Sequence, residues 1–399
     1  MKPLHIALSI IVSTFIVLAT PVAAKPLKVY ILCGQSNMEG HAQIHTFPAI
    51  AKDPQTAAMH KLMVGADGKP AVIDDVWIAY SYGNFSGDPV GKKSGKLTAG
   101  FGSQHHVGTG KIGPELTFGI YMNKALNEPI LLIKNAWGGK SLMVDFRPPS
   151  GGEIADEKLR EKAKQKVGKY YQHMMQHVKE VLADPKKVYP DYDAKQGVEL
   201  AGFVWFQGFN DLVGPYPRTD PTKGKKSTKD YSEYSRLLRC FIRDVRKDLK
   251  APKLPFVVGV LGTGGEEASD GAKAFRDAMA TPAGMNEFKG NVVNVFTHKY
   301  WPAEIDVVMA KVNAAKAPFS KESKKIKKSD MKPEEKKKAF AEIRAKSDAA
   351  IEKALTKEEL FIYQSGRSNQ GFHYHGSAKF FGQIGKAFAD ALVDLKKGN

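Results

Sequence analysis

The chain has 399 residues, of which 42% are hydrophobic and 10% aromatic, with 60 Lys and Arg against 42 Asp and Glu and only 2 Cys. This composition excludes general disorder, and two cysteines exclude a disulfide-stapled miniprotein or a Cys-rich metal scaffold. The length fits one large domain or two modest ones. A formal net charge of +18 raises the question of whether binding an acidic partner is the function.

The first 24 residues have the pattern of an export signal. Lys2 supplies a positive start, residues 6–19 form an apolar run broken only by Ser and Thr, and residues 22–24 offer small side chains for cleavage. The alternative is a membrane anchor, but about 14 apolar residues are short for roughly 30 Å of hydrocarbon. We therefore expect residues 1–24 to be removed and residues 25–399 to form a secreted or periplasmic domain that binds no membrane.

Short apolar runs alternate with helical patterns along the rest of the chain. Residues 27–32 form an apolar run that glycine ends, as in a buried parallel strand, and Pro114 marks the first turn of a helix that ends before Asn127. The alternation predicts a three-layer α/β/α domain with a mainly parallel sheet. Further strands are predicted at 76–80, 130–133, 203–206, 256–261 and 292–296, and further helices at 157–182, 231–249 and 377–395.

Two segments interrupt this alternation. Residues 83–113 are rich in Gly, Ser, Lys and His and are predicted to be a long surface loop. Residues 316–357 hold 14 Lys and Arg against seven acids, about +7 of the net charge, and are predicted to be a Lys-rich insertion that is helical from about Lys332 on. The insertion lacks the interleaved aromatic side chains of single-strand nucleic-acid platforms, so we expect no nucleic-acid partner.

The two cysteines have no obvious partner. Cys33 ends the first predicted strand, and Cys240 lies within a predicted helix. Both positions are apolar, so we expect two buried free thiols rather than a disulfide.

The strongest candidate for catalysis directly follows the first predicted strand, in the segment GQSNMEG at residues 34–40. A Ser just past a strand end can stand exposed at the rim of the sheet, where the start of a helix favours negative charge. The segment is not the G-x-S-x-G elbow, because position 38 is Met. The alternative is that Ser36 only caps a helix.

Three other segments place polar groups at the same edge of the predicted sheet. Asn210 offers an amide donor at a strand end, as an oxyanion site needs, although it could equally belong to an ordinary turn. The double glycine at 138–139 lets a backbone N–H face a ligand. His373 precedes the last helix and can reach back over the sheet, and His375 competes with it for that role.

The order of these segments resembles the SGNH (GDSL-like) hydrolase superfamily. Residues 34–38 (GQSNM), 113–115 (GPE) and 205–208 (WFQG) resemble more narrowly its sialate O-acetylesterase-like branch, carbohydrate esterase family 6. The resemblance implies a flavodoxin-like α/β/α fold and ester hydrolysis with no metal and no other cofactor, usually removal of acetyl groups from carbohydrates. Gln35, Gln207 and Glu115 belong to the matching segments and are candidate substrate contacts.

The resemblance also implies a role for each candidate. Ser36 would be the nucleophile and His373 the general base. The backbone N–H groups of Ser36 and Gly139, with the Asn210 side chain, would form the oxyanion hole. If the register of the family pattern differs by one residue, the N–H of Gly138 takes the place of the N–H of Gly139.

One departure from the family pattern concerns the acid that usually lies three residues before the histidine. That position is Gln370, whose carbonyl oxygen could orient the base but carries no charge. Three readings follow: a Ser–His dyad with Gln370 as the orienter, an acid supplied from elsewhere, or an inactive relative. We favour the dyad, because loss of the acid alone usually leaves much of the catalytic gain.

The sequence therefore predicts a serine esterase acting on an acetylated carbohydrate or polysaccharide. The alternative is a non-catalytic carbohydrate-binding protein on the same scaffold. Since the reaction needs no positive charge, the role left for the basic balance is to concentrate an anionic substrate, such as a uronate-rich or sulfated polysaccharide.

Overall fold

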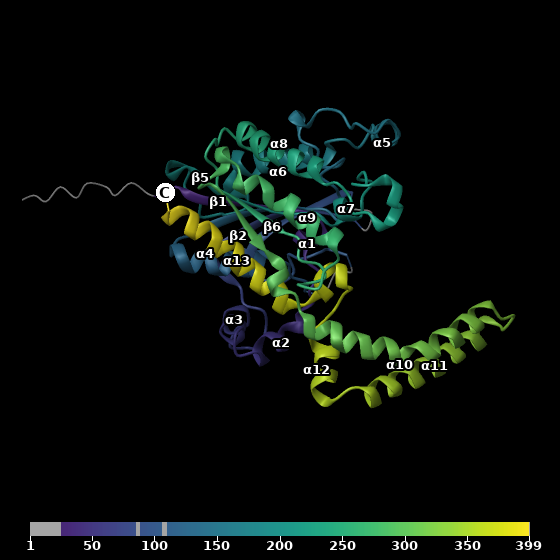
Figure 1. The fold of residues 1–399 in the computed structure, drawn as a ribbon. Coiled ribbons are helices and arrows are strands. Elements are labelled where there is room, and N and C mark those ends of the chain that lie inside the picture. Colours follow the sequence, from purple (N-terminus) through teal and green to yellow (C-terminus); the bar gives the residue numbers. More distant parts are fainter. Residues whose placement is uncertain (1–24, 85–87, 106–109, 399) are drawn as a thin grey trace, which may run out of the picture.

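A single sheet organises the protein (Figure 1). The computed structural model describes residues 25–84, 88–105 and 110–398, so the expected export signal lies outside the described residues. The strand order is β3-β2-β4-β1-β5-β6-β7, and all neighbours are parallel except the antiparallel pair of β2 and β3. The strands are β1 (Leu27–Gly34), β2 (Ile73–Gly83), β3 (Pro89–Leu97), β4 (Ile130–Ala136), β5 (Val198–Phe206), β6 (Phe256–Val260) and β7 (Val292–Phe296).

Helices cover both faces of the sheet, which confirms the expected three-layer α/β/α architecture (Figure 1). Every residue of β1 and of β4 is buried. These strands are mainly apolar, with Lys28 on β1 and Lys134 and Asn135 on β4 as the polar exceptions, because neither face of the sheet meets water there. One face is covered by α4 (Glu115–Leu126) and α13 (Ala378–Lys397), with α2 (Phe47–Lys52) and α3 (Ala57–Met63) packed beyond them. The other face carries α6 (Lys169–Ala183), α8 (Ser232–Asp248) and α9 (Asp270–Ala280).

Two expectations about single elements were wrong. The expected loop at 83–113 contains strand β3, whose side chains alternate between exposed and half-buried as far as Leu97. An antiparallel edge strand rich in Lys and Gly has no apolar pattern to reveal it. The expected helix at 157–182 is two helices, α5 (Glu157–Ala163) and α6, because Gly168 before α6 has φ +70° and breaks the helical path.

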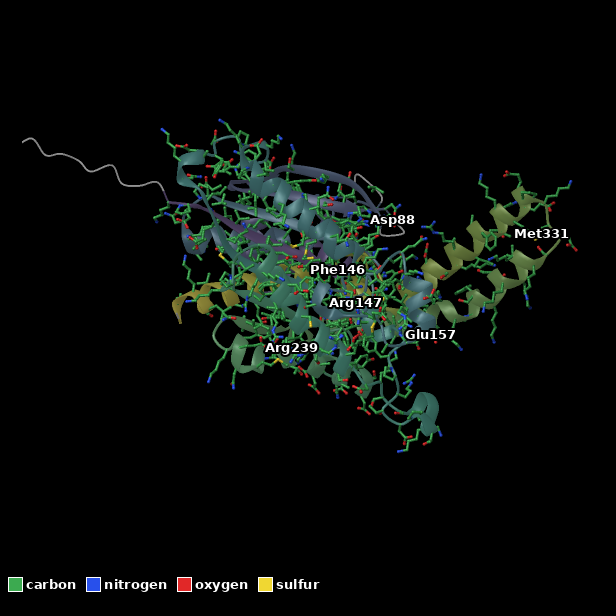
Figure 2. The ribbon with its side chains drawn as sticks, turned by 90° about the horizontal axis from the view of Figure 1, so that it is seen from above. Asp88, Phe146, Arg147, Glu157, Arg239 and Met331 are labelled. Carbon is green, nitrogen blue, oxygen red and sulfur yellow. The ribbon has the colours of Figure 1, made fainter. Side chains whose placement is uncertain are left out.

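The Lys-rich insertion is a helical hairpin that projects away from the body (Figure 1). It is formed by α10 (Ala303–Lys328) and α11 (Pro333–Ala354), so its first helix begins well before the expected start at about Lys332. Met331 lies at its tip (Figure 2). Val308, Val312, Ile351 and Leu355 form a small apolar core at its base, and α12 (Lys357–Ser365) leads back to the body.

Both cysteines are free and buried, as expected for Cys33 on β1 and Cys240 on α8. Within residues 25–84, 88–105 and 110–398, no helix combines the length and apolar character needed to cross a membrane.

Candidate active site

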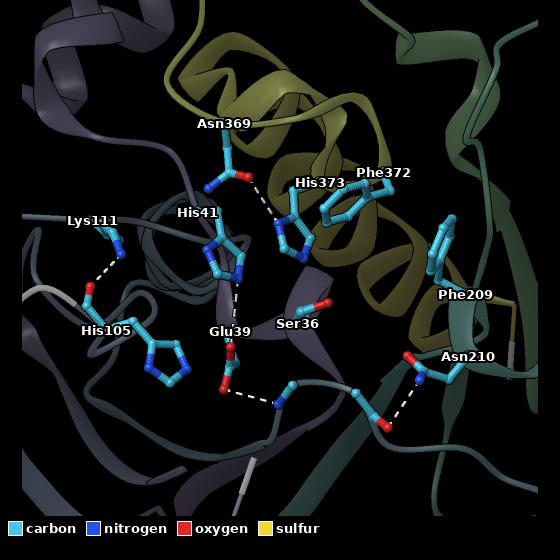
Figure 3. Close-up of a pocket in the computed structure, with 12 residues that line it drawn as sticks. Ser36, Glu39, His41, His105, Lys111, Phe209, Asn210, Asn369, Phe372 and His373 are labelled. Atoms are coloured by element: carbon cyan, nitrogen blue, oxygen red, sulfur yellow. Dashed lines mark hydrogen bonds and ion pairs between the residues drawn. The ribbon is translucent and has the colours of Figure 1, made fainter. Parts of the chain in front are cut away.

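The candidate site lies where the strand order changes direction. From β1 the chain first builds β2 and β4 on one side and then β5, β6 and β7 on the other. In parallel sheets, a crevice opens at the carboxyl ends of the strands at such a switch point. The loops after β1, β4 and β5 meet there and bring Ser36, Gly139 and Asn210 into one pocket of about 450 Å³, which His373 also lines (Figure 3).

Ser36 is the first residue of the short helix α1 (Ser36–Glu39), directly after β1. Two glycines permit this sharp turn. A Cβ at Gly34 would lie 2.0 Å from the Phe206 carbonyl oxygen, and Gly40 has φ +84°. Because Ser36 begins the helix, its N–H has no preceding helical carbonyl as a partner. That N–H is therefore suited to face a ligand.

The Asn210 amide is held by two other loops. Its Oδ1 accepts a hydrogen bond from Gln35 Nε2 at 2.8 Å, and its Nδ2 donates to the Gly139 carbonyl oxygen at 2.9 Å. An amide nitrogen carries two N–H groups, so one donor remains for the pocket that Asn210 lines.

Of the two neighbouring glycines, Gly139 is the better candidate for an oxyanion donor. The Gly138 N–H already donates to Glu39 Oε1 at 3.1 Å. Gly139 lines the pocket at φ +74°, a conformation that favours glycine. The buried Asp211 carboxylate fixes this loop from below by accepting the backbone N–H groups of Leu142 and Met143 at 2.7 and 2.9 Å.

The three expected substrate contacts lie inside the protein instead. Gln35 and Gln207 are each 1% exposed and Glu115 is fully buried. Gln35 Oε1 accepts from the Gly208 N–H at 3.0 Å, and Gln207 Nε2 donates to the same oxygen at 3.1 Å. These bonds hold the loops that carry Ser36 and Asn210. The sequence could not show this, because the protein itself supplies the hydrogen-bond partners.

Glu115 belongs to a buried ion pair beneath the pocket. Its Oε2 is 2.7 Å from Lys134 Nζ, and its Oε1 accepts from the Gly113 N–H at 2.9 Å. Lys134 also donates to the main-chain oxygens of Glu39 and Phe101 at 2.8 and 2.7 Å. A buried charge pair with further hydrogen bonds favours one defined arrangement of the loops around it.

His373 lines the pocket with its ring fixed on two sides. Its Nδ1 is 3.0 Å from Asn369 Oδ1, which leaves Nε2 as the nitrogen available to Ser36 (Figure 3). The His41 ring stacks on it at a centroid distance of 3.9 Å and an angle of 5°. Burial lowers the pKa of His373 to about 2, with His41, Lys111 and His105 adding to the shift. The imidazole is therefore neutral at working pH, the form that can accept a proton.

The orienting group differs from the expected one by a single residue. The Gln370 side chain is exposed, while its carbonyl oxygen accepts the N–H groups of His373 and His375 at 3.0 and 2.9 Å. This tight turn brings the Asn369 side chain, rather than that of Gln370, to His373 Nδ1. His375 is held by Asp306 on α10 at 2.8 Å and is not among the residues that line the pocket.

Several pocket residues had not been singled out from the sequence. Glu39 and His41 lie within five residues of Ser36, a proximity that could have drawn attention to them. Phe372 is another, and it forms an apolar wall with Phe209, with 5.7 Å between the two ring centroids. Lys111 reaches the pocket from the loop before α4.

The sheet with helical layers on both faces is a three-layer α/β/α fold, and the pocket lies at the switch point of its strand order. Residues 26–299 match the model of the family described as carbohydrate esterase, sialic acid-specific acetylesterase, and the chain belongs to this family. The matched range includes Ser36, Gly139 and Asn210 and ends before His373.

Solved structures with some likeness include a protein from Arabidopsis thaliana, at 20% identity and a TM-score of 0.36, covering 68% of this chain and 86% of that one. Another is a carbohydrate acetylesterase from Xanthomonas citri, at 15% identity and a TM-score of 0.36, covering 67% of this chain and 49% of that one. A search of curated proteins found no match. The family assignment therefore rests on the family model.

Proposed function

We propose that this protein is a secreted or periplasmic serine esterase that removes acetyl groups from a carbohydrate or polysaccharide. The observation that carries the proposal is the convergence of Ser36, Gly139, Asn210 and His373, from four separate segments, in one pocket. Membership of a carbohydrate esterase family supports the substrate class. The pattern of residues 1–24 supports export.

In the proposed mechanism, Ser36 Oγ attacks the acetyl carbonyl carbon while His373 Nε2 takes the hydroxyl proton. The N–H groups of Ser36 and Gly139 and the Asn210 amide stabilise the tetrahedral oxyanion. His373 then gives the proton to the leaving sugar oxygen, and the acetyl group stays on Ser36. A water molecule, deprotonated by His373, releases acetate and restores Ser36.

The test replaces the nucleophile. Ser36→Ala is expected to lower acetate release from p-nitrophenyl acetate and from acetylated polysaccharides by more than about 1,000-fold, because alanine has no hydroxyl group to form the acyl-enzyme. Ser320→Ala, on the exposed arm, is the matched control and should keep full activity. The melting temperature of each variant reports whether it is folded.

Two results would overturn the proposal. Turnover that survives Ser36→Ala contradicts the role of this serine. A folded wild-type protein that binds carbohydrate but releases no acetate from any ester supports the alternative, a non-catalytic carbohydrate-binding protein.

A further inference from the structure

Two buried side chains in the pocket have no role in the proposed mechanism. Glu39 and His41 are 1% and 7% exposed, and both line the pocket beside Ser36 (Figure 3). Glu39 Oε1 accepts the Gly138 N–H at 3.1 Å, and Glu39 Oε2 lies 3.5 Å from His41 Nε2. Burying a carboxyl group is costly unless it is well paired, so its presence here calls for an explanation.

The pair also contacts His373, the proposed general base. The His41 ring lies parallel to the His373 ring, with 3.9 Å between the centroids. Glu39 therefore contacts the oxyanion loop directly, through Gly138, and the general base indirectly, through His41. The Glu39 main-chain oxygen is in turn held by Lys134 Nζ at 2.8 Å.

We infer that Glu39 and His41 form a positioning pair that couples the oxyanion loop to the face of the general base, in place of the acid that the family pattern usually supplies. The inference rests on the proposed function. Neither residue bonds to His373 Nδ1, which Asn369 occupies, so the pair is not the third member of a triad. It acts through Gly138 on the oxyanion donor and through the stacked ring on the base.

In this pair, a proton can lie on either of two facing atoms. Within the described residues, neither Glu39 Oε2 nor His41 Nε2 has a hydrogen bond, although they face each other. Burial lowers the pKa of His41 to about 3 and raises that of Glu39 to about 7. When Glu39 is ionised, His41 Nε2–H can donate to it. When Glu39 is protonated, its O–H can donate to His41 Nε2.

The ionised form of Glu39 is the one suited to catalysis. During the reaction His373 becomes an imidazolium ion, and a carboxylate behind the stacked ring stabilises that charge. The groups around Glu39 are His41, His105, Lys111, Lys134 and Tyr80. The two lysines and His105 favour ionisation of Glu39, while burial opposes it. The balance puts its titration within the working pH range.

The decisive variant is Glu39→Gln, which keeps the size and an oxygen acceptor for the Gly138 N–H but cannot ionise. With p-nitrophenyl acetate, wild-type kcat/KM is expected to rise with pH through a limb near pH 7 as Glu39 ionises. In Glu39→Gln this limb disappears, kcat falls by roughly 10-fold, and KM stays within about 2-fold. Glu342→Gln, on the exposed arm, is the matched control and keeps the wild-type profile.

A second variant separates a coupled pair from two independent residues. His41→Phe keeps an aromatic ring beside His373 but removes the nitrogen that faces Glu39. It should also abolish the limb near pH 7, and the double variant should be no slower than the slower single variant, because the two residues act as one unit.

Losses that multiply in the double variant, or a wild-type pH profile in either single variant, would overturn the inference while leaving the esterase function intact. Turnover that survives Ser36→Ala would instead overturn the function itself. If Glu39→Gln does not fold, the pH profile of His41→Phe decides alone.

Discussion

Asn369 gives His373 a neutral hydrogen-bond acceptor from one residue before the position where the related pattern usually has a carboxylate. The amide oxygen, 3.0 Å from Nδ1, selects the tautomer in which Nε2 is free to accept a proton. It supplies no negative charge to the imidazolium that forms in the proposed mechanism. The orientation of the base and the stabilisation of its charge are therefore separate tasks in this pocket.

Variants of Asn369 and Gln370 test whether the orientation of the base and the stabilisation of its charge are separate tasks. Asn369→Ala should lower kcat by roughly 10- to 100-fold, a part of what a positioned general base contributes. Asn369→Asp should retain or exceed wild-type activity, because the carboxylate both orients the ring and stabilises its charge. Gln370→Ala is the matched control, and since its side chain is exposed it should have little effect on kcat. A larger loss in Gln370→Ala than in Asn369→Ala would reverse the assignment.

At the scale of elements, the arm formed by α10 and α11 is largely separate from the site. None of its residues lines the pocket, and its apolar core lies at its own base. The end of the arm next to the body does contact the loop that carries His373, because Asp306 near the start of α10 is 2.8 Å from His375 Nε2. Changes at the end of the arm next to the body and changes in its outer part should therefore differ in their effect on activity.

Shortening the arm tests this difference. With residues 316–345 replaced by a short Gly-Ser turn, kcat/KM for p-nitrophenyl acetate should stay within about 2-fold of wild type. Asp306→Ala should lower activity more than the shortening does, because it frees His375, which lies two residues from the proposed general base His373. Steady-state kinetics and melting temperatures of the two variants check this. Equal losses would show that the outer arm supports the site.

For the whole molecule, the open question is what the net charge of +18 does. About +7 of it lies in residues 316–357, most of which project away from the body of the protein (Figure 2). Ser36 and His373, the groups that react in the proposed mechanism, are neutral. The charge of this segment can therefore act on the encounter with substrate rather than on the chemical step.

Salt dependence distinguishes these roles. Raising the salt from about 10 mM to about 500 mM should lower kcat/KM on acetylated pectin, an anionic polymer, by roughly 10-fold, because attraction between exposed charges is screened. Acetylated xylan and p-nitrophenyl acetate are the less charged comparisons and should change by less than about 2-fold. The same salt response on all three substrates would contradict a role for the charge in substrate capture.

The sequence by itself determined the layered architecture and the edge of the sheet at which to look for a site. Buried parallel strands such as β1 and β4 are apolar along most of their length, and that signal is local. Ser36, Gly139 and Asn210 follow strand ends, so their shared edge could be predicted from the order of the segments. Strand β3 was not predicted, because a polar edge strand has no apolar run that would reveal it.

Only the tertiary structure decided which polar side chains face the pocket. Gln35, Gln207 and Glu115 are turned inward, and Asn369 rather than Gln370 meets the base. Glu39 and His41 gain their importance from partners that are distant in the chain, at Gly138 and His373. The physical reason is that local periodicity fixes which segments are buried, whereas a hydrogen bond depends on where two distant segments place their atoms within a few tenths of an ångström.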